Sequence, residues 1–480
     1  MAAQDSTTRG RKGRTAGDNG PDPGIDFDLA IVGGGFSGLC TAWHLLTDKR
    51  LPPSFNCVVI EPCERLGAGL AYRTDSPRHL LNVRAKGMSI TEGDPGSFAR
   101  WLATAAPEFS PADFAPRGLY RRYINDCLSR ARAQRPDTLT VLRDEVRAVE
   151  EKTGAGRYRL ELQSGRTILA RSVVLAIGNL PPKAERYTDL LCPPWGLHTD
   201  YRRLETLAIV GAGLTALDVI LEAEASGFAG RYTVVSPRGQ FPLPHGEPHL
   251  PVPPELHTWA AELAAERPRL RALLHAFQRR RKAGCGWEQL VDALRRHAPS
   301  IWSRLSPDDK RRFLRHLRMP WNLHLHRSCH RSMEVVKRLE ETGRLHLVAA
   351  RVTGAERCAG AAGPAVRLRL QHGPAPALDA DLAVNGTGLF CDILRTESPL
   401  VAQLIAGRLA TPDEFHLGLK VNGAGQLISA DGLEQPGLFT VGTLRRGAEL
   451  ECTAVPEIRR QVRVMAEELI RLLAGDTGSH

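Results

Sequence analysis

The feature that most constrains this chain is a glycine-rich turn in the stretch DLAIVGGGFSGLC at residues 28–40. The apolar residues at its start predict a buried strand over 28–32, and glycines follow at Gly33, Gly35 and Gly38. In this spacing the first glycine permits a tight turn, the second lets a ligand approach the backbone, and the third lets a helix pack closely on the strand. The stretch therefore predicts a strand–turn–helix unit.

The residues around this turn have the chemistry of a dinucleotide site. A helix predicted over 36–47 begins with Phe36 and Ser37, whose free N–H groups and positive helix end would face a pyrophosphate. The next predicted strand, 56–62, ends near Glu61, where an acid accepts hydrogen bonds from ribose hydroxyls. Strand, glycines, helix and acid together predict a bound dinucleotide.

The same arrangement occurs a second time, in TLAIVGAGLTALDVI at residues 206–220. We predict a strand over 206–210 and a helix over 214–226, with alanine in place of the third glycine. The chain therefore contains two βαβ units. The residues of the second turn that we expect to contact a dinucleotide are Gly211, Gly213, Leu214 and Thr215.

The two units differ at the ends of their second strands. Glu61 ends the first, whereas the predicted strand 232–239 carries no acid and has Arg238 near its end. An arginine accommodates the 2′-phosphate of NADPH, which an acid would repel. The first site therefore suits FAD and the second suits NADPH. In the alternative interpretation, Arg238 is a solvated turn residue.

Further candidate cofactor contacts lie in the segment after Glu61, GAGLAYRTDSPRHLLNVRAKGMS at 67–89. Small residues such as Gly69 ahead of Tyr72 let the backbone pass close to a cofactor. Asn82 is a polar residue in an otherwise apolar run, which suits a hydrogen bond to the edge of a flavin ring. The alternative is that Asn82 caps a turn and Tyr72 belongs to the core.

Residues 251–345 are predicted to form a helical insertion rich in arginine, histidine and tryptophan. Within it, MPWNLHLHR at 319–327 has the highest concentration of candidate functional side chains. Three interpretations of His324, His326 and Arg327 are open. They pack the insertion onto the rest of the protein, they contact an anionic substrate or cofactor, or the histidines bind a metal. Because acids and cysteines at ligand spacing are missing nearby, we expect no metal.

Composition excludes several classes of protein. Ten cysteines without a Cys-x-x-Cys pair argue against a zinc site, a disulfide framework and a dithiol redox centre. The net charge of +11 comes largely from dispersed arginines, which argues against nucleic-acid binding. No apolar run approaches the roughly 20 residues of a membrane span. The polar start of the chain lacks the apolar centre of a signal peptide, so we expect a cytoplasmic protein.

These elements predict an α/β fold with two Rossmann-like dinucleotide-binding domains, one for FAD and one for NADP, and a helical insertion. The apolar run VVLAIGN (173–179) is echoed by ADLAVNGTG (380–388), which we interpret as a return of the chain to the first domain. We expect a disordered tail at 1–25, an FAD-binding domain at 26–200 and 376–475, and an NADP-binding domain at 201–375 that contains the insertion 251–345.

Taken together, the motifs are similar to one family. The chain contains, in order, GAGLAY, HLLNV, FAPRGLYRRYI, VVLAIGN, GAGLTALDVI, RRFLRHLRMPWNLHLHR, VNGTG and GTLRRGAELECTAVPEIRRQ. From residue 28 to 470 it resembles the bacterial FAD–NAD(P)-binding oxidoreductases, whose relatives include nitrosuccinate-forming aspartate N-monooxygenases. By this resemblance Thr443, Leu444 and Arg445 would face the flavin ring or its ribityl chain. The remaining glycines that we assign to cofactor binding are Gly178, Gly388 and Gly442.

The expected activity follows from the two cofactors and the resemblance. NADPH would reduce FAD, the reduced flavin would capture O₂ as a C4a-hydroperoxide, and oxygen would pass to a small nucleophilic substrate, with the nitrogen of an amino acid or amine favoured. Asn82, His324, His326 and Arg327 are the candidate catalytic residues. One alternative is an NADPH-dependent reductase or dehydrogenase that inserts no oxygen. Another is a cofactor-holding sensor or interaction protein. The oligomeric state is left open.

Overall fold

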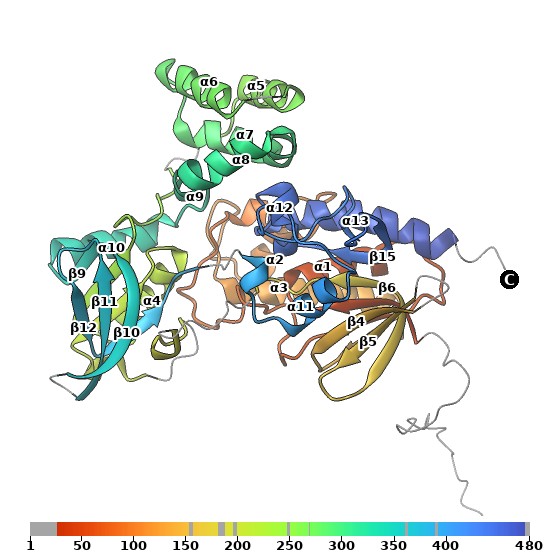
Figure 1. Ribbon diagram of the computed structural model, residues 1–480, viewed down its shortest axis with the longest axis horizontal. Helices are drawn as coiled ribbons and strands as arrows, with labels where there is room; N and C mark the ends of the chain where they lie inside the picture. Colours follow the sequence, from red (N-terminus) through yellow and green to blue (C-terminus); the bar gives the residue numbers. More distant parts are fainter. Residues whose placement is uncertain are drawn as a thin grey trace, which may run out of the picture.

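The computed structural model contains two α/β domains side by side, with a block of helices above them (Figure 1). The predicted tail at 1–25 lies outside the described residues. In the part of the chain that the structure describes, no helix is both long and apolar enough to cross a membrane. The structure describes residues 26–152, 157–180, 188–194, 199–246, 250–267, 269–360, 363–388 and 392–475.

The first domain is built on a sheet in which β1 (Phe27–Val32) has a central position. The strand order is β14 (Gln426–Ile428), β15 (Glu434–Thr440), β6 (Thr167–Leu175), β1, β2 (Cys57–Ile60) and β3 (Leu139–Leu142). From β15 to β3 the strands are parallel, and β14 pairs antiparallel with β15. β4 (Val146–Lys152) and β5 (Arg157–Leu162) extend the sheet as antiparallel strands beside β6.

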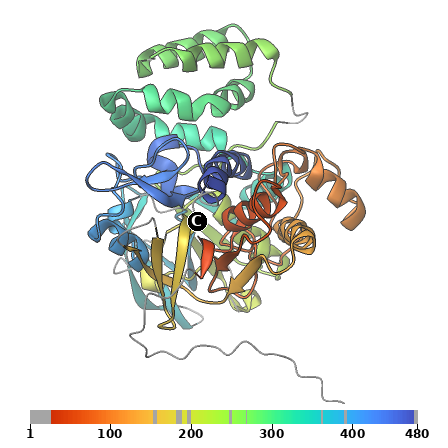
Figure 2. The same ribbon diagram turned by 90° about the vertical axis from the view of Figure 1, so that its right-hand side faces the viewer.

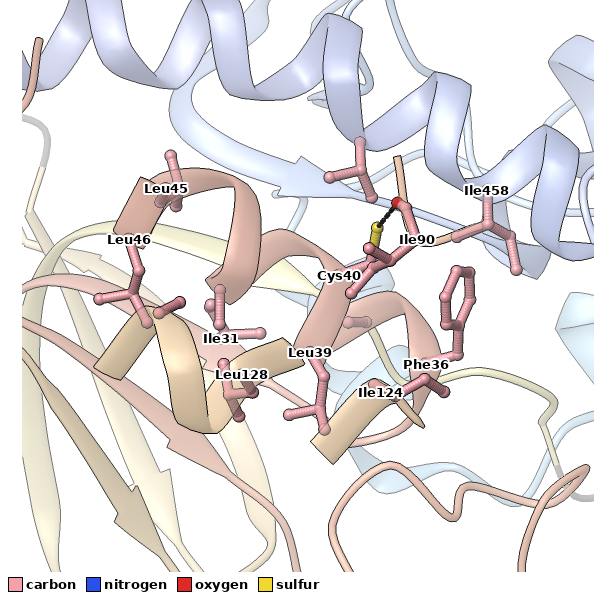
Figure 3. Close-up of a cluster of buried hydrophobic side chains, with 14 of the residues drawn as sticks. Ile31, Phe36, Leu39, Cys40, Leu45, Leu46, Ile90, Ile124, Leu128 and Ile458 are labelled. Atoms are coloured by element: carbon pink, nitrogen blue, oxygen red, sulfur yellow. Dashed lines mark hydrogen bonds between the residues drawn. The ribbon is translucent and has the colours of Figure 1, made fainter. Parts of the chain in front are cut away.

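Helices bury both faces of this sheet. α1 (Phe36–Thr47), α3 (Arg117–Gln134) and α13 (Val455–Gly475) share one apolar cluster, and α2 (Ser97–Ala105) packs beside α3. Figure 3 shows side chains of α1 in this cluster, with Leu39 close to Ile124 and Leu128 of α3. α11 (Pro399–Ala406) covers the opposite face together with β4 and β5. Apolar residues therefore line both faces of β1, as its uninterrupted apolar run predicts.

The second domain repeats this plan on a smaller scale. Its parallel sheet has the order β13 (Leu382–Asn385), β7 (Thr206–Val210), β8 (Arg231–Ser236) and β9 (Leu345–Ala349). α4 (Leu214–Ala225) and α10 (His330–Glu341) pack on one face. The antiparallel strands β10 (Arg351–Gly360), β11 (Gly363–Gln371) and β12 (Ala377–Ala380) form a separate sheet that covers the other face.

The strand pairing places the end of the second domain later in the sequence than the boundary predicted at residue 376. β13 pairs with β7 in the second sheet, with Ala383 opposite Ala208, so the chain returns to the first domain only after residue 388. The similarity between VVLAIGN and ADLAVNGTG is nevertheless structural. β6 and β13 occupy the same position in two different sheets, each directly beside the strand that leads into a glycine turn.

The helical insertion is shorter than predicted. It consists of α5 (Pro254–Ala265), α6 (Leu270–Lys282), α7 (Trp287–Arg304), α8 (Pro307–Arg312), a π-helical segment (Phe313–Leu317) and α9 (Arg318–Leu325). α10 lies within the predicted range 251–345, but it packs on α4 and belongs to the second domain. Both views show α5–α9 as a layer of its own on one side of the two sheets (Figures 1 and 2).

Ion pairs join the three parts of the molecule. Arg117 of α3 and Asp218 of α4 lie 2.7 Å apart (Nη1 to Oδ2) and link the two α/β domains. Arg295 of α7 donates two hydrogen bonds of 2.7 and 2.9 Å to Glu457 of α13, which joins the insertion to the first domain. Because these partners are largely buried, losing one of them would leave an uncompensated charge in a poorly solvated position.

The tightest backbone approach in the first domain yields a stability prediction. A Cβ on Gly38 would lie 1.9 Å from the carbonyl oxygen of Gly33, which is backbone and has no freedom to move aside. Gly38→Ala should therefore destabilise the protein by about 3 kcal/mol. The matched control is Gly118→Ala in α3, where the nearest atom is at an ordinary contact distance of 3.5 Å. Urea unfolding should leave that control within about 1 kcal/mol of wild type. Equal stabilities of the two variants would contradict the packing.

Candidate functional site

The first glycine turn is a close backbone crossing. Gly33 has a φ of +106°, and a Cβ there would lie 2.4 Å from the carbonyl oxygen of Ala176, so no other residue fits without a shift. Gly35 caps α1 without a side-chain hydrogen bond, so the first N–H groups of the helix remain directed at the space beyond it. The Phe36 side chain is buried against Tyr120, with ring centroids 5.8 Å apart, which leaves its backbone as the part that faces a ligand.

Two segments enclose this turn. Glu61 follows β2, and its Oε2 accepts a 2.7 Å hydrogen bond from the N–H of Gly34, which holds the carboxylate across the turn. Gly69, with a φ of +44°, passes so close that a Cβ on Gly35 would lie 3.4 Å from its Cα. Tyr72 packs on Tyr120 with ring centroids 5.0 Å apart and joins the edge of the apolar core. This contact supports the core interpretation of Tyr72.

The C-terminal segment meets the first turn at the carboxyl ends of the parallel strands. A Cβ on Gly442 would lie 3.4 Å from Ser37 Oγ, and the Gly442 N–H donates a 2.8 Å hydrogen bond to Gln461. The Thr443 hydroxyl donates to the carbonyl of Gly178, and Leu444 is buried. The predicted contacts Ser37, Gly178, Gly442 and Thr443 therefore lie together, at the edge of the sheet where α/β proteins bind ligands.

The second turn has the same backbone but is open. Gly211 has a φ of +107°, and a Cβ there would lie 2.2 Å from the carbonyl oxygen of Gly386, the counterpart of the Gly33 crossing. Gly213 caps α4, and a Cβ on it would meet no atom of the described residues within 4 Å. A Cβ on Gly388 would likewise have no atom within 4 Å in the part of the chain that the structure describes, and Arg238 is exposed just beyond the end of β8. Leu214 and Thr215 follow in the first turn of α4, both half-buried.

Asn82 lies where the three parts of the molecule meet. A small cavity beside it is lined by Leu214 from the second turn, by Arg117 and Asp218, and by Ser328 at the end of the insertion. The Asn82 carbonyl accepts a 3.0 Å hydrogen bond from His245 Nε2. The structure thus brings a residue predicted near the flavin to the side of the second dinucleotide turn.

Arg327 differs from the expectation that it contacts an anionic substrate. Its guanidinium is only 2% exposed and forms ion pairs with Glu288 and Asp292, both on α7. Two carboxylates therefore neutralise it, and the pairs hold the end of the insertion against α7. We assign Arg327 a structural role.

The two histidines of the same stretch do not converge. His324 Nδ1 donates a 2.7 Å hydrogen bond to the Pro320 carbonyl, and the ring packs edge-on against Trp287. His326 caps the end of α9, where burial and the nearby Arg295 lower its pKa to about 4, so it is neutral at physiological pH. Among the described residues, no group of three or more His, Cys, Asp and Glu side chains could hold a metal ion. The contacts of His324 therefore support the interpretation in which this residue has a packing role.

A buried carboxylate beside these residues was missed by sequence reasoning. Glu451 accepts a 2.7 Å hydrogen bond from Trp321 Nε1 and lies 4.0 Å from His326 Nε2. Burial raises its pKa to about 7, an effect that Trp321 and Arg295 reduce. Its partners are far away in the sequence, so no local pattern marks it.

Comparison with known proteins agrees with this geometry. Residues 30–180 match a family described as FAD-NAD(P)-binding. No curated protein matches the chain.

Solved structures match over nearly the whole chain. The ornithine N-hydroxylase of Kutzneria sp. 744 is 16% identical, with a TM-score of 0.58 over 93% of this chain and 99% of that one. The L-lysine 6-monooxygenase of Pseudomonas syringae is 16% identical, with a TM-score of 0.61 over 93% and 99%. The bacillithiol disulfide reductase of Bacillus cereus is 14% identical, with a TM-score of 0.50 over 92% and 98%. The predicted fold class, with two dinucleotide-binding domains, is confirmed.

The open second turn yields a prediction about cofactor use. Gly213 has an extended backbone that valine adopts, with room for its side chain, so Gly213→Val should fold and retain FAD. The branched side chain would occupy the space of the second dinucleotide and should weaken NADPH binding by at least about tenfold, or roughly 1.4 kcal/mol. Flavin absorbance measures the first property, and the rate of flavin reduction at varied NADPH measures the second.

Gly35→Val is the matched comparison at the first turn. Its side chain would press on Gly69 and fill the space in front of α1, so this variant should lose FAD. Wild-type flavin reduction by NADPH in Gly213→Val, or full flavin content in a folded Gly35→Val protein, would contradict the assignment of the two turns.

Proposed function

We propose that this protein is an FAD-dependent, NADPH-using monooxygenase that oxygenates a small nucleophilic substrate, with an amine nitrogen as the reacting atom. The observation that carries the proposal is the pairing of an enclosed glycine turn in the first domain with an open one in the second, where Leu214 lines a cavity together with Asn82 of the first domain. An enclosed site suits a cofactor that stays bound, and an open site suits one that enters and leaves in each catalytic cycle.

The residues of the two turns fit these cofactors. Gly35, Ser37 and Glu61 would hold the pyrophosphate and ribose of FAD, because they place N–H groups and a carboxylate at the end of the parallel strands. Gly213 and Arg238 would hold NADPH in the same way, with a cation in place of the acid. Bound FAD would supply the redox chemistry and the activation of O₂.

The residues of the chain itself would position the two cofactors relative to each other and exclude water from the junction between them. The Arg117–Asp218 ion pair holds α4 against the first domain, so the second turn keeps its place relative to the first. Apolar side chains such as Leu214 and Leu81 line the junction with Asn82 and would limit the entry of water to a flavin bound there. Structures with similar folds carry the names of ornithine and lysine hydroxylating enzymes, which supports an amine as the substrate.

The similarity to a bacillithiol disulfide reductase favours one alternative, a reductase that inserts no oxygen. The cysteines give it little support. Burial raises the pKa of Cys452, near the predicted flavin contacts, to about 12, and it raises that of Cys40, on α1, even further. Both thiols therefore stay protonated and unreactive near neutral pH. The sequence also contains no Cys-x-x-Cys pair.

The proposed activity is tested with the purified yellow protein, NADPH, isotopically labelled O₂ and a panel of amino acids and amines. We expect one of these substrates to accelerate NADPH oxidation and to yield an N-oxygenated product that carries labelled oxygen. NADPH oxidation that reduces an acceptor without incorporating label would establish the reductase alternative. A flavoprotein that NADPH never reduces would be a cofactor-holding protein instead.

The specificity for NADPH should depend on Arg238. A hydrogen bond to a charged group contributes about 1.5–3 kcal/mol. Arg238→Ala should therefore lower kcat/KM for flavin reduction by NADPH about 10- to 100-fold and leave NADH almost unaffected. Arg231→Ala, at the opposite end of β8 and also exposed, is the control and should not change flavin reduction by either cofactor. If both variants leave the NADPH-to-NADH ratio unchanged, Arg238 is a solvated turn residue.

A further inference from the structure

The helical insertion contains a cavity of about 230 Å³. It lies between α6, α7 and α9 and reaches the segment that follows α12 (Arg446–Glu449). Among the described residues that line it, His324 is the ionisable one. The apolar residues around it include Leu273, Phe277, Leu294, Ala298, Trp302 and Leu450.

Three side-chain nitrogens of the lining residues are hydrogen-bonded to the protein. Trp302 Nε1 donates a 2.8 Å hydrogen bond to the Gly447 carbonyl, and Trp321 Nε1 donates to Glu451. His324 Nδ1 donates to Pro320. The walls therefore offer a ligand apolar contact surface. A void of this size exceeds an ordinary packing defect, and apolar cavities of about 150 Å³ already take up small apolar molecules.

One end of the cavity lies beside the segment predicted to contact the flavin. Leu450 lines it and comes directly after α12, the short helix that follows Thr443, Leu444 and Arg445 in the sequence. Leu450 has a φ of +62°, a conformation that a leucine adopts only where its surroundings hold it. The next residue, Glu451, is buried and bonded to Trp321, another residue of the lining. A carboxylate thus lies directly beside the lining residues Leu450 and Trp321, next to the segment predicted to contact the flavin.

We propose that this cavity binds the apolar body of the substrate, with the amino group toward Glu451. The substrate is then a primary amine with a long alkyl or an aromatic group. This rests on the function proposed above and names the substrate class for it.

A charged amino acid such as ornithine or lysine fits this cavity poorly. Its α-carboxylate needs a cation, and Arg295 and Arg327 already have carboxylate partners. Arg295 donates to Glu457 at 2.7 and 2.9 Å, and Arg327 pairs with Glu288 and Asp292. Burying a carboxylate without a partner is costly. The insertion therefore selects against such substrates and in favour of apolar amines.

The first test is a series of primary amines from butylamine to decylamine, with phenethylamine, ornithine and lysine for comparison. Binding is followed by tryptophan fluorescence without NADPH, since Trp302 and Trp321 line the cavity. Each added methylene should tighten binding about fourfold until the cavity is full. The KM for amine-dependent NADPH oxidation should fall in the same order. Ornithine and lysine should bind at least tenfold more weakly than octylamine.

Variants locate the binding site. Ala298→Phe, on α7, would fill part of the cavity and should weaken octylamine binding about tenfold while butylamine binding stays unchanged, which also shows that the variant is folded. Ser300→Phe adds the same ring on the exposed side of α7 and should leave both amines unaffected. Leu273→Trp, on α6, provides a second filled cavity should Ala298→Phe fail to fold. FAD content and flavin reduction without substrate should match wild type throughout.

The outcomes separate the two proposals. Chain-length-dependent binding that Ala298→Phe abolishes, without an oxygenated product, would support the cavity and overturn the monooxygenase. Oxygenation of a short polar amino acid, with alkylamines that neither bind nor react, would support the monooxygenase and overturn the cavity assignment. Alkylamine binding that is equally strong in Ala298→Phe, Leu273→Trp and wild type would also overturn it.

Discussion

Two backbone crossings govern the rest of this structure. At Gly33 and at Gly211 a carbonyl oxygen from a neighbouring strand end occupies the place of a Cβ, at 2.4 and 2.2 Å. Each crossing brings the first strand of a domain against the end of its partner strand, β6 or β13, and turns the chain sharply into a helix. The positive ends of α1 and α4 then lie over the carboxyl ends of their sheets, and the other predicted ligand contacts collect there.

Small differences between the crossings separate two kinds of binding site. At the first, Gly38 lets α1 approach β1 closely, and Gly69 and Gly442 close over the helix end. At the second, Ala216 replaces that glycine, and the space in front of Gly213 is open. The acid Glu61 and the cation Arg238 occupy corresponding ends of the second strands. One fold, used twice, thereby provides a closed site and an accessible one.

Local patterns predicted the local structure well. The predicted strand 206–210 matches β7, and the predicted helix 36–47 matches α1, because glycine turns and apolar runs determine both. Partners that are distant in sequence were not predictable in this way. β13 reads like a return to the first domain, since only pairing with β7 assigns it to the second. In the sequence Arg327 resembles a substrate-binding cation, but Glu288 and Asp292 of α7 neutralise its charge in the fold. The environment of Glu451 likewise comes from the distant residues Trp321 and Arg295.

Glu451 follows α12 and contacts Trp321 of the insertion, and its environment differs from that of side chains that only support the sheets. Its folded pKa of about 7 lies above the ordinary value of a glutamate. The folded state therefore favours the protonated form, so this group's contribution to stability is present below the ordinary glutamate pKa and is lost as the pH rises through about 7. A glutamine or an apolar residue would avoid that loss. Perturbed carboxyl groups of this kind are concentrated in functional sites. Beside a large apolar cavity, Glu451 therefore fits recognition of an amine better than it fits packing alone.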